Sequence, residues 1–165
     1  MNEQSISQYF GHVEWRKEFH RYYETHEIEE FLNNIMPELI KIGWPEESKP
    51  VYYEDFKDIL SDSSNKRIRL ISISNRLKTY LDDLKDIYEN VIFFLKSDQG
   101  TQGKTKEDKK KYSELLLQKE NMFLIRISKV LQRISDLSEA YKIKYDSTSR
   151  ILSIVEYERK QTGRE

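Results

Sequence analysis

All three histidines of the chain lie in one stretch, HVEWRKEFHRYYETHE, which begins at His12. On a helix, His12, Arg16, His20 and Glu24 share one face because they are four residues apart. Imidazoles and a carboxylate could together ligate a divalent metal ion. His12 and His20 are two helical turns apart, about 12 Å, so only His20 with Glu24 remains as a chelating pair. Neither a Glu-x-x-His nor a His-Glu-x-x-His spacing is present, and we predict no metal site.

Arg21 and His26 are separated by four residues in RYYETH. This spacing resembles the Arg-x4–6-His pattern of HEPN-type ribonucleases, which are all-helical and similar in size to this chain. The resemblance implies that Arg21 stabilises a phosphate and that His26 serves as the proton-transfer group, in a site formed across a dimer interface. The chain departs from that family in two ways. Tyr22 follows the arginine, where the family tends to have a polar residue, and the pattern lies near the N-terminus, whereas the family usually places it late in the chain. We prefer the interpretation that His20 and His26 border a core, since acid–base catalysis needs a positioned pair in a cleft.

Most other routes to catalysis are missing from the sequence. The chain has no cysteine, which excludes disulfides, thiolate zinc sites and a cysteine nucleophile. Its glycines form no phosphate-binding loop, and no Gly-x-Ser-x-Gly, kinase or Walker motif occurs. We therefore expect no enzyme, no catalytic residue and no cofactor. Neither a signal-peptide pattern nor an apolar run of ~20 residues occurs, so we expect a cytoplasmic protein without a membrane partner.

Charge is distributed unevenly along the chain. Residues 1–60 hold 13 acidic and 6 basic side chains, a net charge of −7, and residues 61–165 hold the other 16 acidic and 22 basic ones, a net charge of +6. We prefer the interpretation that these parts pack together, but the basic part could instead meet nucleic acid. Candidate nucleic-acid-binding residues flank the apolar seams: Arg67, Arg69, Arg76, Arg126, Lys129 and Arg133. Alternatively, they pair with Asp or Glu as coiled-coil e and g residues do.

Shorter helices are expected in the N-terminal part. Residues 12–25 carry a mixed apolar stripe, and residues 28–39 repeat apolar side chains every three or four positions, with Thr25 as an N-cap. Pro37 should kink or break this second helix because it lacks an amide donor. The stretch GWPEESKP, residues 43–50, predicts a loop. A third helix, VYYEDFKDIL, should end at SDSSN.

The longest periodic pattern lies between residues 66 and 145. Its first half contains two series with a spacing of seven: Leu70, Leu77, Leu84 and Val91, and Ile73, Tyr80, Ile87 and Phe94. Its second half contains Leu116, Phe123, Val130 and Leu137. The polar stretch 96–110 between them should be a loop. The patterns predict an all-α helical bundle built on a long antiparallel helical hairpin, about residues 66–96 and 105–145, with shorter N-terminal helices.

The C-terminal part allows two structures. Residues 143–157 could be a helix that restarts after the cap signals Asp146–Ser149, or a β-hairpin, because apolar residues alternate on either side of DSTS. We favour the helix, since an isolated hairpin is only marginally stable. The chain is then a single helical domain, residues 1–165, with acidic N-terminal helices (1–60), the long hairpin (61–145) and a C-terminal extension (146–165).

The expected function is a non-enzymatic protein-interaction module that acts through helix faces. It would be an adaptor, inhibitor or assembly subunit, encoded by a phage or another mobile element. Apolar faces of this length exceed what one hairpin can bury, so we expect a protein partner in a homo- or hetero-oligomer. The candidate partner-binding residues are Trp15, Phe19 and Tyr23. The alternatives are a nucleic-acid-associated subunit of a ribonucleoprotein and a HEPN-like ribonuclease.

Overall fold

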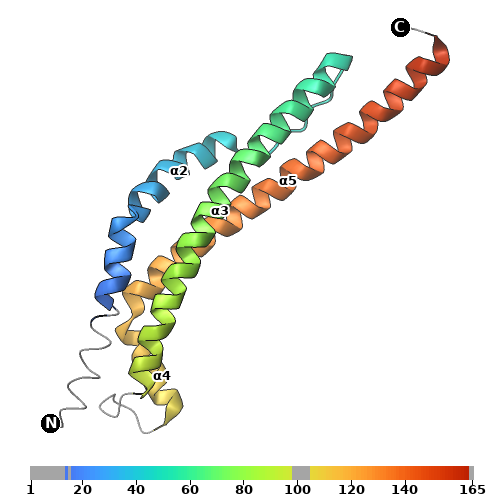
Figure 1. Cartoon of the computed structure of the whole chain (residues 1–165). Coiled ribbons are helices and arrows are strands. Elements are labelled where there is room, and N and C mark those ends of the chain that lie inside the picture. The colour runs from blue at the N-terminus through green and yellow to red at the C-terminus, as the bar shows by residue number, and fades with distance from the viewer. Residues whose placement is uncertain (1–13, 15, 98–104, 164–165) are drawn as a thin grey trace, which may run out of the picture. The chain divides into compact units, whose positions relative to one another are not determined.

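The computed structural model describes residues 14, 16–97 and 105–163 (Figure 1). Throughout these residues every regular element is a helix, which confirms the all-α prediction. The chain forms two compact units. Unit 1 comprises Met1–Ile35 and Arg76–Val130, and unit 2 comprises Met36–Asn75 and Leu131–Glu165. The expected single domain stays a prediction.

Unit 1 contains the helix over residues 16–25, the first half of α2 (Ile28–Ile42), the last part of α3 (Tyr53–Ser97), α4 (Lys106–Leu116) and the start of α5 (Gln118–Thr162). Thr25 is helical, so its prediction as an N-cap is wrong. The chain turns instead at Glu27, which has a φ of 49°. The fully buried side chains that form this core include Phe19, Ile28, Leu77, Leu84, Leu117 and Ile127.

Helix α2 continues through Pro37 to Ile42, so the expected break at this proline is wrong. Proline removes only one backbone hydrogen bond, and Leu39 beyond it is fully buried in unit 2, which favours continuation of the helix. The helix ends where Gly43 adopts a φ of +57° and its amide donates to the Leu39 carbonyl at 3.1 Å. This confirms the predicted loop after residue 42, because a positive φ is favourable for glycine.

Helix α3 is longer than the sequence indicated, since it begins at Tyr53 and passes through SDSSN without interruption. The expected end at SDSSN is therefore wrong, and the predicted third helix is the first part of α3. Ser, Asp and Asn disfavour helix by only ~0.5 kcal/mol each, whereas the apolar side chains of Phe56 and Leu70 are buried on either side of this stretch. The Asp55 carboxylate accepts the Val51 and Tyr52 amides at 2.9 and 2.8 Å and so caps the start of α3.

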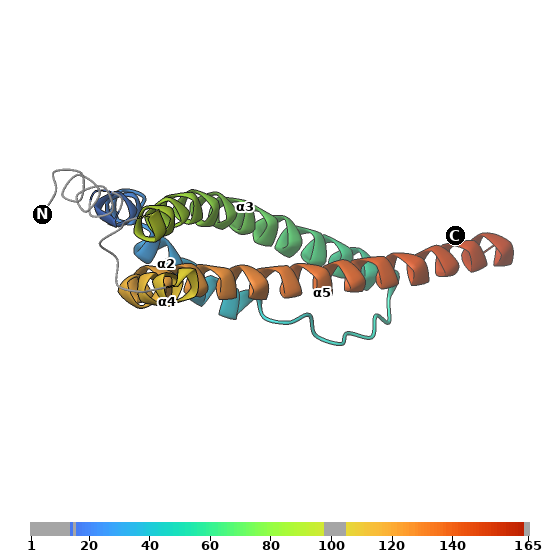
Figure 2. The same cartoon turned by 90° about the horizontal axis from the view of Figure 1, so that it is seen from below.

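In unit 2, residues 53–75 of α3 run antiparallel to residues 131–162 of α5 (Figure 2). The Tyr53 hydroxyl donates to Glu156 at 2.7 Å, and the Lys66 ammonium lies 5.4 Å from the centre of the Tyr141 ring. The Tyr141 hydroxyl donates to the last carbonyl of α2, at Ile42, at 2.8 Å. Because α5 extends to Thr162, the helical structure favoured for residues 143–157 is confirmed and the β-hairpin is wrong. The expected restart after Asp146–Ser149 is also wrong, since α5 passes through these residues without a break.

The second arm of the predicted hairpin consists of two helices. α4 begins at Lys106, inside the stretch expected to be a loop, because Thr105 and Asp108 form a capping box. The middle of that expected loop, residues 98–104, lies outside the described residues. α4 ends at Leu116, and Leu117 separates it from α5 with a φ of −104° and a ψ of 19°. Leu117 is fully buried against Val91 and Leu95 of α3.

Candidate functional site

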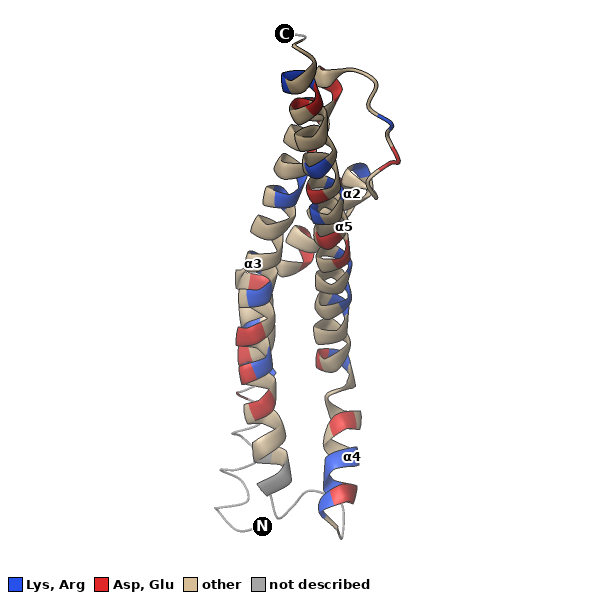
Figure 3. Ribbon diagram, turned by 90° about the vertical axis from the view of Figure 1, so that its right-hand side faces the viewer, with Lys and Arg blue, Asp and Glu red and all other residues tan. Residues whose placement is uncertain are grey.

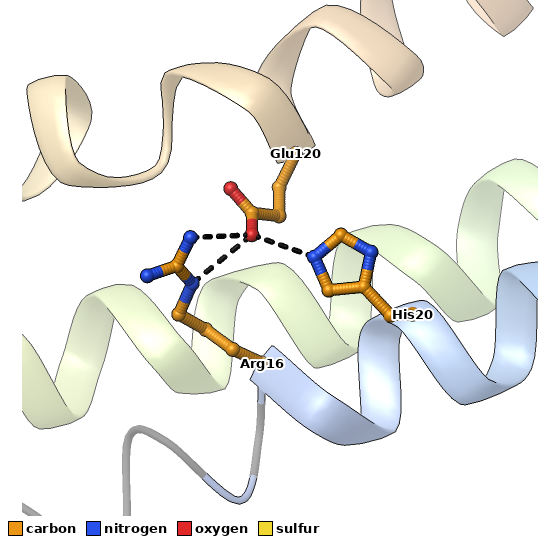
Figure 4. Close-up of polar contacts among 3 residues, drawn as sticks. All are labelled: Arg16, His20 and Glu120. Carbon is orange, nitrogen blue, oxygen red and sulfur yellow. Dashed lines mark hydrogen bonds and ion pairs between the residues drawn. The ribbon is translucent and has the colours of Figure 1, made fainter.

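The most strongly connected polar cluster joins the helix over residues 16–25 to the first turn of α5 (Figure 4). Arg16 donates to Glu120 Oε1 from Nε at 3.0 Å and from Nη2 at 2.9 Å. His20 Nε2 lies 2.9 Å from the same oxygen. Because an ionised carboxylate only accepts hydrogen bonds, His20 carries its proton on Nε2 here. The Glu120 side chain is 1% exposed, whereas those of Arg16 and His20 are 32% and 34% exposed.

The electrostatics of Glu120 favour the charged carboxylate. Burial raises the pKa of its carboxyl, but hydrogen bonds from its own backbone amide, Arg16 and His20 outweigh burial, so the pKa lies below its ordinary value. Its position in the first turn of α5 adds the favourable field of the helix N-terminus. The second oxygen, Oε2, is buried and has no hydrogen-bond partner among the described residues. The cluster is a buried ionic link between two helices.

The histidine face predicted from the sequence has a different partner in the structure. His20 binds Glu120 and not Glu24, which is exposed. No group of three His, Asp or Glu side chains within the described residues could hold a metal ion. His12 lies outside those residues. Sequence reasoning missed Glu120 because it is 100 positions from His20 and nothing in its neighbours distinguishes it from other helical glutamates.

Arg21 and His26, the pair similar to the ribonuclease pattern, make separate contacts. The Arg21 side chain is 76% exposed and lies 3.8 Å from Glu18 of its own helix. His26 stacks on Tyr22 at 4.0 Å between ring centres, and its Nδ1 lies 3.0 Å from the Tyr22 carbonyl oxygen. The structure does not bring the two side chains into one cleft within this chain.

Three of the six candidate nucleic-acid-binding residues are engaged inside their own unit. In unit 2, Arg69 donates to both carboxylate oxygens of Glu38, at 2.5 and 2.9 Å. In unit 1, Arg126 Nη1 donates to both oxygens of Glu29, at 2.6 and 2.7 Å. Arg76 lies over the Phe31 ring at 4.3 Å and donates to the Tyr80 hydroxyl at 2.7 Å.

The other three basic candidates differ in exposure. Lys129 and Arg133 are exposed and form no ion pair with any other described residue. Arg67 is half-buried, and its Nε has no hydrogen-bond partner in the described part of the chain. Acidic and basic residues alternate along α4 and along the part of α3 in unit 1 after Lys78 (Figure 3). The α3 segment from Lys66 to Lys78 carries five basic residues and no acidic one.

The candidate partner-binding residues of the first helix belong to the core where they are described. Phe19 is 0% exposed and Tyr23 is 7% exposed. Tyr23 stacks on Phe123 at 4.6 Å between ring centres, and its hydroxyl donates to Glu29 at 2.6 Å. Trp15 lies outside the described residues. A partner surface must therefore use other side chains than Phe19 and Tyr23.

Unit 1 has an open groove of about 810 Å³ between α3 on one side and α4 and α5 on the other. Its apolar lining comes from both sides: Tyr88, Ile92, Phe93, Leu124 and Ile125. Phe93 is 68% exposed and Ile125 is 44% exposed, so two large apolar side chains face solvent there. The charged residues of the groove carry both signs: Lys85, Glu89, Lys110 and Glu114. Sequence reasoning predicted excess apolar surface on the long helices but could not locate this groove.

No family model matches the chain, and neither a curated protein nor a solved structure matches it. The fold defines its class as an all-α helical bundle in which α3 packs against α5. None of the helices in the described ranges combines the length and the apolar character that crossing a bilayer requires.

Proposed function

We propose that the chain is a non-enzymatic protein-interaction module, and that it binds an amphipathic helix of a partner protein in the groove of unit 1. The supporting observation is the exposure of Phe93 and Ile125 on opposite walls of that groove. Exposed apolar side chains gathered in a concave surface are typical of binding sites, because water is excluded from them on association. Catalysis has less support, since no nucleophile contacts the only buried carboxylate cluster in the described residues.

A helix suits this groove because α3 forms one helical wall and α4 with α5 forms the other, and a partner helix can place an apolar stripe between them. Lys85 and Glu89 on one wall and Lys110 and Glu114 on the other provide both charges at the edges. A partner helix with apolar residues at i, i+3 or i+4, and i+7, flanked by both acidic and basic side chains, would match this lining.

The groove predicts a specific loss of partner binding. Replacing Phe93 and Ile125 together with serine should weaken binding roughly thirty- to several-hundredfold, because each large apolar side chain contributes about 1–2 kcal/mol on burial. The measurement is affinity isolation from native host lysate, followed by a titration of the recovered partner. Met122→Ser is the matched control, because Met122 is 63% exposed on α5 but does not line the groove.

Two results would contradict this proposal. One is a partner that wild type, the Met122→Ser control and the double variant recover equally. The other is the reproducible absence of any partner from the host lysate, which would remove the expected function.

The alternative function is a nucleic-acid-associated subunit. Of its candidate binding residues, Lys129 and Arg133 are exposed and could contact a phosphate backbone. This alternative has less support because Arg126 and Arg69 are occupied by glutamates. We expect Arg126→Gln to lower the stability of unit 1 by about 0.5–1 kcal/mol through loss of the Glu29 contact, and Lys129→Gln to leave stability unchanged. Hydrogen exchange of the first half of α2 measures the difference.

Nucleic-acid binding is tested on the same two variants. The measurement is fluorescence anisotropy with a labelled single-stranded RNA at low salt. We expect either no binding or binding that neither substitution weakens. Steeply salt-dependent binding that Lys129→Gln reduces would favour the alternative. RNA cleavage that disappears in both Arg21→Ala and His26→Ala would favour the ribonuclease.

A further inference from the structure

Helix α5 carries apolar side chains on two opposite faces within unit 2. The inner face contacts α2 and α3 through residues such as Tyr141, which is 1% exposed. Four large apolar side chains lie on the other side, which we call the outer face of α5: Ile143 (61% exposed), Ile151 (48%), Ile154 (58%) and Tyr157 (63%). At 100° per residue, these four occupy an arc of about 120°. The outer face is thus a second apolar stripe that nothing within unit 2 covers.

We propose that the outer face of α5 binds the same face of a second copy of this chain, with the two helices antiparallel. This contact uses residues other than those of the groove in unit 1, so it is independent of the function proposed above. A two-fold symmetric contact must be self-complementary, because each pair of residues that meets across it meets twice. The outer face meets this requirement in one register.

That register places Ile143 of one copy opposite Ile154 of the other. The same offset places Tyr157 of one copy at the level of Ala140 of the other, the only alanine of the chain. Ile151 then lies beside Ser147 of the second copy. The contact between Ile143 and Ile154 therefore forms twice, once on each side of the two-fold axis, which passes between Thr148 and Ser149.

Charge determines the orientation. Arg150 lies within the arc of the outer face, between Tyr157 and Ile143, and Asp146 lies just beyond the Tyr157 edge. Neither forms an ion pair with another described residue. In the antiparallel register, Arg150 of each copy lies beside Asp146 of the other, so the complementary pair forms twice. A parallel, in-register pair would bring Arg150 against Arg150 and Asp146 against Asp146, and like charges at facing positions oppose association.

Sedimentation velocity over a range of concentrations tests the proposal on the full chain. The mass should rise with concentration from 20.0 kDa toward twice that value. Because the contact spans only about 27 Å of helix, from residue 140 to residue 157, half-association is expected near micromolar concentrations. Ile154→Arg should weaken association at least tenfold. Ile68→Arg, at a residue of α3 in unit 2 that is 63% exposed, is the matched control and should leave association unchanged.

A charge exchange tests the register. Arg150→Asp and Asp146→Arg should each weaken association, and the double variant should restore it, because the two charges exchange places across the contact. Both positions are exposed, so circular dichroism of the three variants should show an unchanged helix content. A chain that stays at 20.0 kDa at all concentrations would overturn the proposal. Equal effects of Ile154→Arg and Ile68→Arg, or a double variant no better than the single ones, would overturn it as well.

Discussion

Glu120→Ala is expected to lower the free energy of unfolding of unit 1 by about 2–3 kcal/mol. Removing one member of a buried ion pair commonly costs about 3–5 kcal/mol, because the remaining charge loses its partner. Arg16 and His20 are each about one-third exposed, so water can partly replace the carboxylate and the loss should fall at or below the lower end of that range. Hydrogen exchange at the start of α5 is the appropriate measurement, because a chain of two compact units need not unfold in one step.

Two further substitutions separate the ionic link from general effects of losing a glutamate. Glu120→Gln keeps the shape and one accepting oxygen, so its effect should be smaller than that of alanine. Glu24→Ala removes an exposed glutamate from the partner helix and should change stability by less than about 0.5 kcal/mol. If Glu120→Ala were as mild as Glu24→Ala, the cluster would not hold the two helices together.

Two hydrogen-bonded carboxylates of unit 1, Glu120 and Glu29, predict how its stability depends on pH. The folded-state pKa of Glu120 lies below its ordinary value, and so does that of Glu29, which accepts hydrogen bonds from Tyr23 and Arg126. A lowered pKa contributes stability above the unfolded value, about 4.3 for Glu, and that contribution is lost as pH falls through the folded value. Unit 1 should therefore keep these contributions from pH 7 to about pH 5 and lose them below about pH 4. In Glu120→Ala the acid-dependent loss should be smaller.

Phe19→Ala is expected to lower the free energy of unfolding of unit 1 by about 3–5 kcal/mol. Phe19 is fully buried, and truncating a buried phenylalanine removes its transfer free energy and leaves a cavity. Phe93→Ala should change stability by less than about 0.5 kcal/mol, because the Phe93 side chain is 68% exposed. Hydrogen exchange of the α3 and α5 amides in unit 1 provides the comparison.

Comparison of the Phe19→Ala and Phe93→Ala variants also separates the effect of core packing from the effect of partner binding. Phe93→Ala should weaken partner binding without loss of stability, whereas Phe19→Ala should affect binding only to the extent that unit 1 unfolds. If the Phe19→Ala variant were stable but no longer bound the partner, Phe19 would be a partner-binding residue, as expected from the sequence.

The long helices could be predicted from the sequence because apolar residues recur every seven positions from Leu70 to Val91 and again from Leu116 to Leu137. That spacing gives each helix one broad apolar face, and two such faces bury each other. The helix ends were harder to predict. SDSSN and Thr25 carry local signals for a helix end or cap, yet burial of neighbouring side chains outweighs the few tenths of a kcal/mol that such signals contribute.

The ion pairs match only in part the charge distribution of the sequence, in which residues 1–60 are acidic and residues 61–165 are basic. Glu38 with Arg69 and Glu29 with Arg126 join the acidic N-terminal part to the basic part within their respective units, as the preferred interpretation predicted. Arg16 with Glu120 reverses this pattern, because the cation comes from the acidic part and the anion from the basic part. Arg16 and Glu120 are 104 residues apart in the sequence, and no local spacing could reveal such a pair.

The junction at Leu117 has a consequence for how the length of the chain can change during evolution. An inserted residue rotates everything after it in the same helix by about 100°. One residue inserted into α5 would rotate the part of the helix that follows it, so the outer face in that part would point in a different direction. In α4, the change would stop at Leu117, because this residue is held by Val91 and Leu95 and lies between the two helices. We expect insertions and deletions to accumulate before Leu117, and the length of α5 to stay constant.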